Sequence, residues 1–122
     1  LQPVVTDGLR DFDAFVDGCD AIISAGAAGV ALLRKEQWQN VPTLQVAIDL
    51  NAVPPAGLEG IEVTATGETI EGKTVYGAIG TGNLKMKIHK RAIASLFESN
   101  DKVLDIDEIF EIGQQLESGS LA

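Results

Sequence analysis

Apolar positions along the chain follow two spacings, and these predict an alternation of helices and strands. Apolar residues three or four apart at 7–17 predict a short helix, with Asp7 capping its amino end. The segment at 20–26 has an apolar core, which predicts a buried strand of the kind found in parallel sheets covered on both faces, and the segment at 44–50 predicts a second buried strand. Between these strands, residues 27–38 are expected to form a short helix or turn.

Two more strands are predicted in the middle of the chain. β-Branched residues at 61–65 and 74–79 predict strands on either side of a polar turn at 66–73. The resulting order of helices and strands is that of an α/β fold with a parallel sheet.

The carboxyl-terminal third is predicted to form closing helices over residues 84–117. Apolar residues recur four apart from Leu84 to Leu96, so they share one face of a helix. Asp105 stands three residues before Glu108, which is a variant of the capping box that begins a second helix.

Three loops rich in glycine, small residues or proline are expected after predicted strands, at residues 24–29, 49–55 and 77–85. Ligands bind beyond the carboxyl ends of parallel strands, so the three loops together predict a binding site, although glycine equally serves plain turns. Asp49 and Asn51 lie two residues apart at a strand end. They either contact a ligand or tie down the proline loop, and both roles stay open.

Length and charge exclude several classes of function. The 122 residues fit a single domain or a fragment of one, and a net charge of −9 at pH 7 argues against a nucleic-acid partner. The longest uncharged stretch, Ala21 to Leu33, is shorter than the roughly 20 residues of a membrane-spanning helix. Leu1 is not an initiator methionine and no leader follows, so we expect a processed chain or a fragment. One cysteine suits a reducing compartment, and we expect a cytoplasmic protein.

One motif match is rejected on physical grounds. The string GETIEGKT at residues 67–74 satisfies the phosphate-loop pattern GxxxxGK[ST]. That motif needs a helix directly after the loop, whereas strand-like residues 75–80 follow, and Glu68 and Glu71 would lie beside the phosphates. A hairpin-like turn is therefore the preferred interpretation. With one histidine and one cysteine, no metal site is expected.

A basic segment surrounds the only histidine, His89. It contains Lys85, Lys87, Lys90 and Arg91. Two interpretations stay open: a solvated helix face, or a site for an anion such as a cofactor phosphate or the acidic tail of a substrate. Lys85 and Lys87 are near the predicted amino end of a helix, where the helix dipole disfavours cations, and this favours a ligand.

Several short segments resemble those of a known enzyme family and stand in the same order. They are WQN at 38–40, DLNAVPPAG at 49–57, GAIG at 77–80, LKMKIH at 84–89 and LFES at 96–99. The chain resembles the NAD(P)-dependent methylene-tetrahydromethanopterin dehydrogenases of one-carbon metabolism over residues 16–116, nearly its whole length. The resemblance implies a Rossmann-like parallel sheet, of which this chain is the later half, with the glycine-rich dinucleotide fingerprint in polypeptide upstream.

The resemblance also implies site residues. Those expected at the cofactor are Ala25, Gly26, Ala27, Asn51, Gly80, Gly82, Leu84 and Lys85. Lys87 is assigned to the substrate or another anion, and Asp49 to favouring the positive charge that develops on the pterin. Asn83 departs from the family pattern, because another glycine is expected there.

The implied activity is oxidation of methylene-tetrahydromethanopterin to the methenyl form, with hydride transfer to NAD or NADP. The reaction needs no nucleophile, and the sequence offers none. Two alternatives stay open: a methylene-tetrahydrofolate dehydrogenase, and a non-catalytic dinucleotide-binding or assembly module. The implied partners are the pterin and further copies of the chain in a homo-oligomer.

Overall fold

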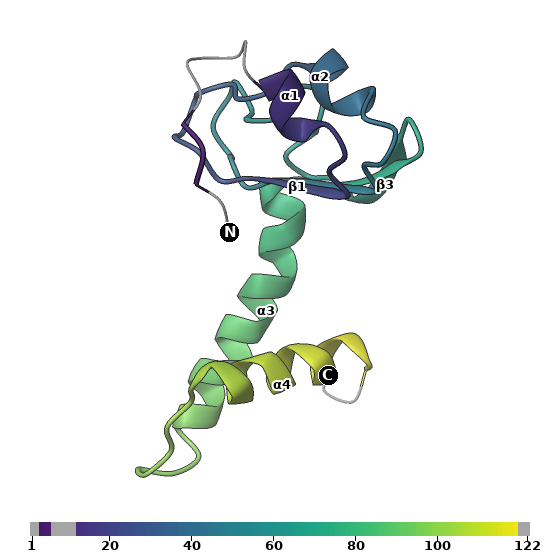
Figure 1. The fold of residues 1–122 in the computed structure, drawn as a ribbon. Helices are drawn as coiled ribbons and strands as arrows, with labels where there is room; N and C mark the ends of the chain where they lie inside the picture. The colour runs from purple at the N-terminus through teal and green to yellow at the C-terminus, as the bar shows by residue number, and fades with distance from the viewer. Residues whose placement is uncertain (1–2, 6–11, 120–122) are drawn as a thin grey trace. The chain divides into compact units, whose positions relative to one another are not determined.

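The computed structural model describes residues 3–5 and 12–119. The chain divides into two compact units, Leu1–Thr81 and Gly82–Ala122. The first unit contains a four-stranded sheet with the order β1-β2-β4-β3 (Figure 1). Its strands are β1 (Ala21–Ser24), β2 (Val46–Asp49), β3 (Thr66–Ile70) and β4 (Lys73–Tyr76).

Three of the four strands are parallel, which fixes where their ends lie. β1 pairs with β2 and β2 with β4 in parallel, whereas β3 is antiparallel to β4. Ser24 stands opposite Asp49, and Ile48 opposite Tyr76, so the carboxyl ends of β1, β2 and β4 lie at one edge of the sheet. This mixed α/β arrangement confirms the predicted Rossmann-like fold class and the two strands predicted at 20–26 and 44–50.

Two short helices lie on the same face of the sheet, α1 (Phe12–Val16) and α2 (Lys35–Gln39) (Figure 1). The core between helices and sheet is centred on Trp38, which is fully buried and whose Nε1 donates to the Glu59 carbonyl at 2.9 Å. α1 confirms the second half of the helix predicted at 7–17, and Asp7 falls outside the described residues. The helix or turn predicted at 27–38 is found as a turn at 28–29, closed by the Val30 amide on the Ala27 carbonyl, and as α2 from Lys35 onward; the residues between them are in neither.

The opposite face of β1 is not covered by the described residues of this unit. β1 is an edge strand, and the Ile23 side chain is 64% exposed, whereas Ser24, which points to the other face, is buried. The expectation that this strand is covered on both faces is therefore wrong for the residues described in the first unit.

The phosphate-loop string forms a β-hairpin, which confirms its rejection. β3 and β4 are joined by Glu71 and Gly72, with φ of 47° and 74°. Two successive positive φ values are those of a type I′ turn, whose twist matches the flanking strands. The turn predicted at 66–73 is therefore present but much shorter, because it comprises only Glu71 and Gly72 while the flanking residues are paired in the two strands.

Residues 61–65 form a turn with buried ends and not the predicted strand. Ile61 and Ala65 are 5% and 1% exposed, so they are apolar because they enter the core. The Val63 carbonyl accepts from the amides of Ile79 and Gly80, at 2.7 Å and 3.2 Å. This segment thus pairs with the start of the next helix and has no strand partner among the described residues.

That helix, α3 (Ala78–Leu96), begins earlier than the sequence predicts. The strand predicted at 74–79 ends at Tyr76, and the loop predicted at 77–85 is helical from Ala78 onward. Gly80 permits this start, because a Cβ there would collide with the Ala65 carbonyl oxygen. Gly77 and Gly80 therefore reflect close backbone packing and not a loop, because a Cβ on either would collide with backbone atoms.

The second unit contains most of α3 together with α4 (Ile106–Glu117). The helical prediction for this region is confirmed, and so is the capping box. Asp105 Oδ1 accepts from the Asp107 amide at 2.9 Å, and Glu108 Oε2 accepts from the Asp105 amide at 3.0 Å. Within this unit Gly113 faces Ile88, and a Cβ on Gly113 would lie 3.1 Å from Ile88 Cδ1.

The two glycines in the first turns of α3 predict opposite effects of alanine. Gly80→Ala should lower the free energy of unfolding by about 1–3 kcal/mol, because its Cβ meets backbone that cannot move freely. Gly82→Ala meets nothing within 4 Å, so stability should stay unchanged or rise by up to about 1 kcal/mol through helix propensity. Urea titration of both variants measures the difference, and equal effects would contradict the described start of α3.

Candidate functional site

Two of the three predicted loops lie together at the carboxyl edge of the sheet. The loop at 25–29 follows β1, and the loop at 50–58 follows β2. The Leu50 amide donates to the Ser24 carbonyl at 2.9 Å, and Asn51 Nδ2 lies 3.5 Å from the Ala27 carbonyl oxygen. The segments therefore meet, as expected for a site beyond the ends of parallel strands.

Asp49 holds both ends of the second loop. Its side chain is 2% exposed. Oδ1 accepts from the Asn51 amide at 3.0 Å, and Oδ2 accepts from the Leu58 amide at 2.9 Å. Buried backbone N–H groups need an acceptor, and Asp49 supplies one to the amides of both Asn51 and Leu58. Sequence analysis left open whether Asp49 contacts a ligand or ties down the proline loop, and these hydrogen bonds are what the second role requires.

Asn51 also directs its side chain into the protein. It is 6% exposed, and Oδ1 accepts from the Val53 amide at 3.0 Å. Nδ2 donates to the Pro55 carbonyl at 3.3 Å in addition to its longer contact with Ala27. One side chain therefore joins the proline loop to the loop after β1.

Ser24 and Gly57 complete this buried polar cluster, and the sequence analysis did not single them out. Ser24 is 4% exposed, and its Oγ has no hydrogen-bond partner among the described residues. A Cβ on Gly57 would collide with Ser24 Oγ and lie 3.0 Å from Asp49 Oδ1. A glycine two residues after a proline pair was the only sequence signal for this close approach.

The small residues predicted at the cofactor have different surroundings. Ala25, Gly26 and Ala27 are exposed beyond the end of β1. Gly80 packs on Ala65, and its amide donates to Val63. Gly82 is half-buried, with open space where its Cβ would be.

Three amides in the first turn of α3, those of Ile79, Gly80 and Thr81, have acceptors within the protein. Besides Ile79 and Gly80, which donate to Val63, the Thr81 amide donates to the Gly77 carbonyl at 2.9 Å. A helix amino end binds phosphate through free amides. The start of α3 is therefore not a ready phosphate site.

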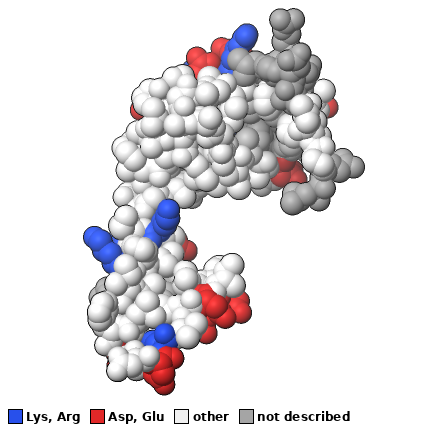
Figure 2. All heavy atoms as spheres, turned by 90° about the vertical axis from the view of Figure 1, so that its left-hand side faces the viewer, with Lys and Arg blue, Asp and Glu red and all other residues white. Residues whose placement is uncertain are grey.

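The basic segment lies within α3, beyond its first turns. Leu84 is half-buried, and Lys85 and Lys87 are exposed. At 3.6 residues per turn, Lys85 and Lys87 point about 200° apart around the helix, whereas Lys87 and Arg91 share a face. On the face drawn in Figure 2 the basic side chains stand apart from one another. The helix-dipole argument for a ligand is therefore wrong, because both lysines lie beyond the first turn.

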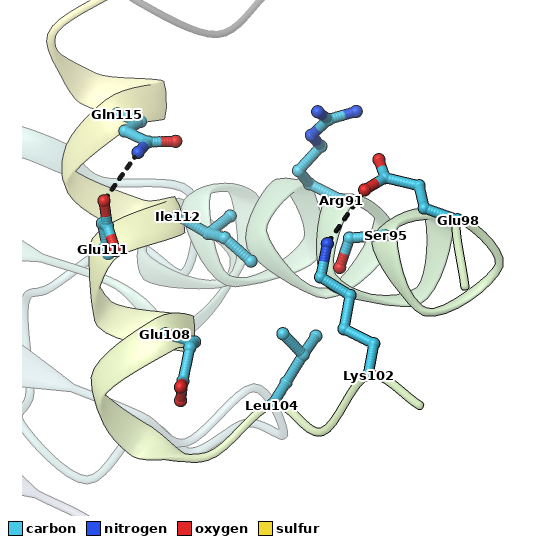
Figure 3. Close-up of a pocket in the computed structure, with 9 residues that line it drawn as sticks. All are labelled: Arg91, Ser95, Glu98, Lys102, Leu104, Glu108, Glu111, Ile112 and Gln115. Atoms are coloured by element: carbon cyan, nitrogen blue, oxygen red, sulfur yellow. Dashed lines mark hydrogen bonds and ion pairs between the residues drawn. The ribbon is translucent and has the colours of Figure 1, made fainter. Parts of the chain in front are cut away.

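A polar cavity of about 210 Å³ lies between α3 and α4 (Figure 3). Lys102 Nζ pairs with Glu98 Oε2 at 2.9 Å, and this hydrogen bond lowers the pKa of the Glu98 carboxyl below its usual value. Arg91, Glu108 and Glu111 also line the cavity. Charges of both signs at an exposed surface stabilise a fold only weakly and do not indicate one class of ligand.

Neither a metal site nor a membrane-spanning helix is found in the part of the chain that the structure describes. No group of three His, Cys, Asp or Glu side chains there is arranged to hold a metal ion. The described helices are too short or too polar to cross a bilayer.

The contact between Ser24 and Gly57 predicts a non-additive pair of substitutions. Gly57→Ala should lower the free energy of unfolding by about 1–3 kcal/mol through overpacking. Ser24→Ala removes only a hydroxyl without a partner and should change stability by less than about 0.5 kcal/mol. The double variant should regain about half of the loss, because Oγ is gone while the Asp49 contact stays. Urea titration of the three variants tests this, and strict additivity would contradict it.

Two curated proteins of Methylorubrum extorquens AM1 are similar to this chain. The chain is 41% identical over 101 residues to "Bifunctional protein MdtA", covering 83% of the chain and 35% of that protein. It is 37% identical over 106 residues to "NAD(P)-dependent methylenetetrahydromethanopterin dehydrogenase", covering 84% of the chain and 36% of that protein. No family model matches.

The chain spans about a third of the length of the curated relatives it matches. Within the chain, however, the similarity extends over more than four fifths of the residues. The resemblance recognised in its short ordered segments is confirmed, and the chain is related by sequence to the NAD(P)-dependent methylenetetrahydromethanopterin dehydrogenases.

Proposed function

We propose that this chain is part of an NAD(P)-dependent dehydrogenase that oxidises methylene-tetrahydromethanopterin to the methenyl form. The observation that supports this most directly is the 37% identity to a protein named for that substrate and cofactor. The site supports it independently, because two loops meet beyond the carboxyl ends of parallel strands, where nucleotides bind in open α/β sheets.

The residues of the first unit fit one side of a dinucleotide. Ala25, Gly26 and Ala27 are small and exposed, so a ligand can approach their backbone closely. The buried side chains of Asp49 and Asn51 hold the adjoining loop in place through hydrogen bonds. The amides of Ile79 and Gly80 are paired within the protein, so we do not assign the pyrophosphate to the start of α3.

Further contacts to the cofactor and substrate belong to the same proposal. Gly82 and Leu84 are assigned to the nicotinamide end, and the open space where a Cβ of Gly82 would lie leaves room for a ligand there. Lys85 is assigned to a cofactor phosphate and Lys87 to the substrate or another anion. Because the two lysines point to different sides of α3, the proposal gives them separate ligands.

Hydride transfer needs no nucleophile from the protein's own side chains. When bound, the nicotinamide ring accepts the hydride that leaves the pterin. The protein then contributes the relative placement of two ring systems and the electrostatics around them. Both carboxylate oxygens of Asp49 are engaged by amides, so we assign Asp49 to placement of the loop and not to direct contact with the pterin.

The proposal includes the remaining polypeptide and the assembly. The relatives are about three times as long as the matched region, so we propose that upstream polypeptide completes the cofactor and pterin sites. We also propose a homo-oligomer and a cytoplasmic location, with which a single cysteine agrees.

An assay of the full-length gene product tests the function. Methylene-tetrahydromethanopterin with NADP or NAD should give reduced nicotinamide, followed by absorbance. Faster turnover of methylene-tetrahydrofolate would instead favour a methylene-tetrahydrofolate dehydrogenase. Cofactor binding without turnover of either pterin would contradict the proposal and favour a non-catalytic module.

The separate positions of Lys85 and Lys87 lead to a prediction. Lys85→Ala should raise the KM for NADP about threefold to tenfold and leave the KM for the pterin unchanged, whereas Lys87→Ala should do the reverse, because each loses one charge-assisted contact. Lys102→Ala, an exposed lysine paired with Glu98, is the matched control. KM values for both substrates measure the effects; if neither variant differs from the control, the basic segment is a solvated helix face.

A further inference from the structure

Asn51 is the one described side chain that hydrogen-bonds to both loops at the carboxyl edge of the sheet. Its Nδ2 donates to Pro55 within its own loop at 3.3 Å, and the same nitrogen lies 3.5 Å from the carbonyl of Ala27, which is 24 residues away. Its Oδ1 accepts from the Val53 amide at 3.0 Å. With 6% of its surface exposed, the carboxamide is directed into the protein and not toward a ligand.

We infer that Asn51 is a positioning residue for the dinucleotide, acting through the loop at 25–27 instead of contacting the cofactor itself. The inference rests on the proposed function and replaces the direct contact expected from the sequence. By joining Ala27 to the proline loop, Asn51 sets where the exposed backbone of Ala25, Gly26 and Ala27 lies relative to β2.

The chemistry of the position requires a carboxamide. Two carbonyl oxygens need a donor, and one backbone amide needs an acceptor, within the reach of one short side chain. Asparagine has two amide hydrogens and a carbonyl oxygen. Aspartate keeps the acceptor but would turn a carboxylate oxygen toward the Ala27 and Pro55 carbonyls, leaving both without their donor.

Asn51→Asp in the full-length enzyme, compared with Asn100→Asp, tests the inference. Asn100 is exposed in the segment between α3 and α4, so its variant makes the same chemical change outside the site. We expect the KM for NADP to rise about tenfold in Asn51→Asp, with kcat and the KM for the pterin changed by less than about twofold. A merely structural defect would lower activity without this separation.

A second readout needs no nucleotide. In the free protein, Asn51→Asp should shift the backbone amide resonances of residues 25–30, and Asn100→Asp should leave them in place. Asn51→Ser, with a hydroxyl that still accepts from a nearby amide, serves if the aspartate variant does not fold.

The outcomes separate the inference from the proposed function. If the wild-type enzyme turns over and Asn51→Asp has the same KM values, the inference is overturned while the proposed function stands. Unshifted amide resonances of residues 25–30 in Asn51→Asp would likewise overturn only the inference. Absence of wild-type turnover on both pterins would overturn the proposed function, and with it the role of Asn51 at a cofactor. A raised KM for NADP together with shifted resonances would support both.

Discussion

The arrangement at the carboxyl edge of the sheet depends on one buried carboxylate. Asp49 ends β2, and its two oxygens accept hydrogen bonds from the amides of Asn51 and Leu58, at the two ends of the loop that follows. An unpaired buried amide costs about 1–3 kcal/mol, so this carboxylate decides whether the loop can fold inward. Asn51 can reach Ala27 only because Asp49 holds the loop after β2 in this position. The contact of Asn51 with Ala27 in turn positions the exposed backbone after β1.

The sequence correctly predicted those elements that are determined by the residue pattern of their own segment. The apolar runs of β1 and β2, the capping box at Asp105 and the hairpin nature of the phosphate-loop string were correct. Residues 61–65 were assigned wrongly, because β-branched residues favour a strand locally, whereas this segment forms a turn whose end residues, Ile61 and Ala65, are buried in the core. The glycines before Lys85 were assigned to a loop, whereas Gly80 serves a backbone contact with Ala65 that only the tertiary structure reveals.

The candidate site shows the same division between local and tertiary information. The sequence named Asp49, Asn51 and the loop after β1, but it could not tell an inward-facing carboxamide from a ligand contact. Nor could it indicate that basic residues close in sequence point to different sides of a helix. The chain therefore contributes mainly two shaped loops, at 25–29 and 50–58, to the proposed dehydrogenase. Small exposed residues lie on their surface, and buried hydrogen bonds hold them in place.

Amide hydrogen exchange in the wild type and in Asp49→Asn tests the anchoring role of Asp49 most directly. One acceptor of the carboxylate becomes a donor in this variant, so the Asn51 amide or the Leu58 amide loses its partner. The account predicts that at least one of the two amides exchanges about tenfold faster, while the Ala47 amide within β2 keeps its rate. Unchanged exchange at both positions would contradict it.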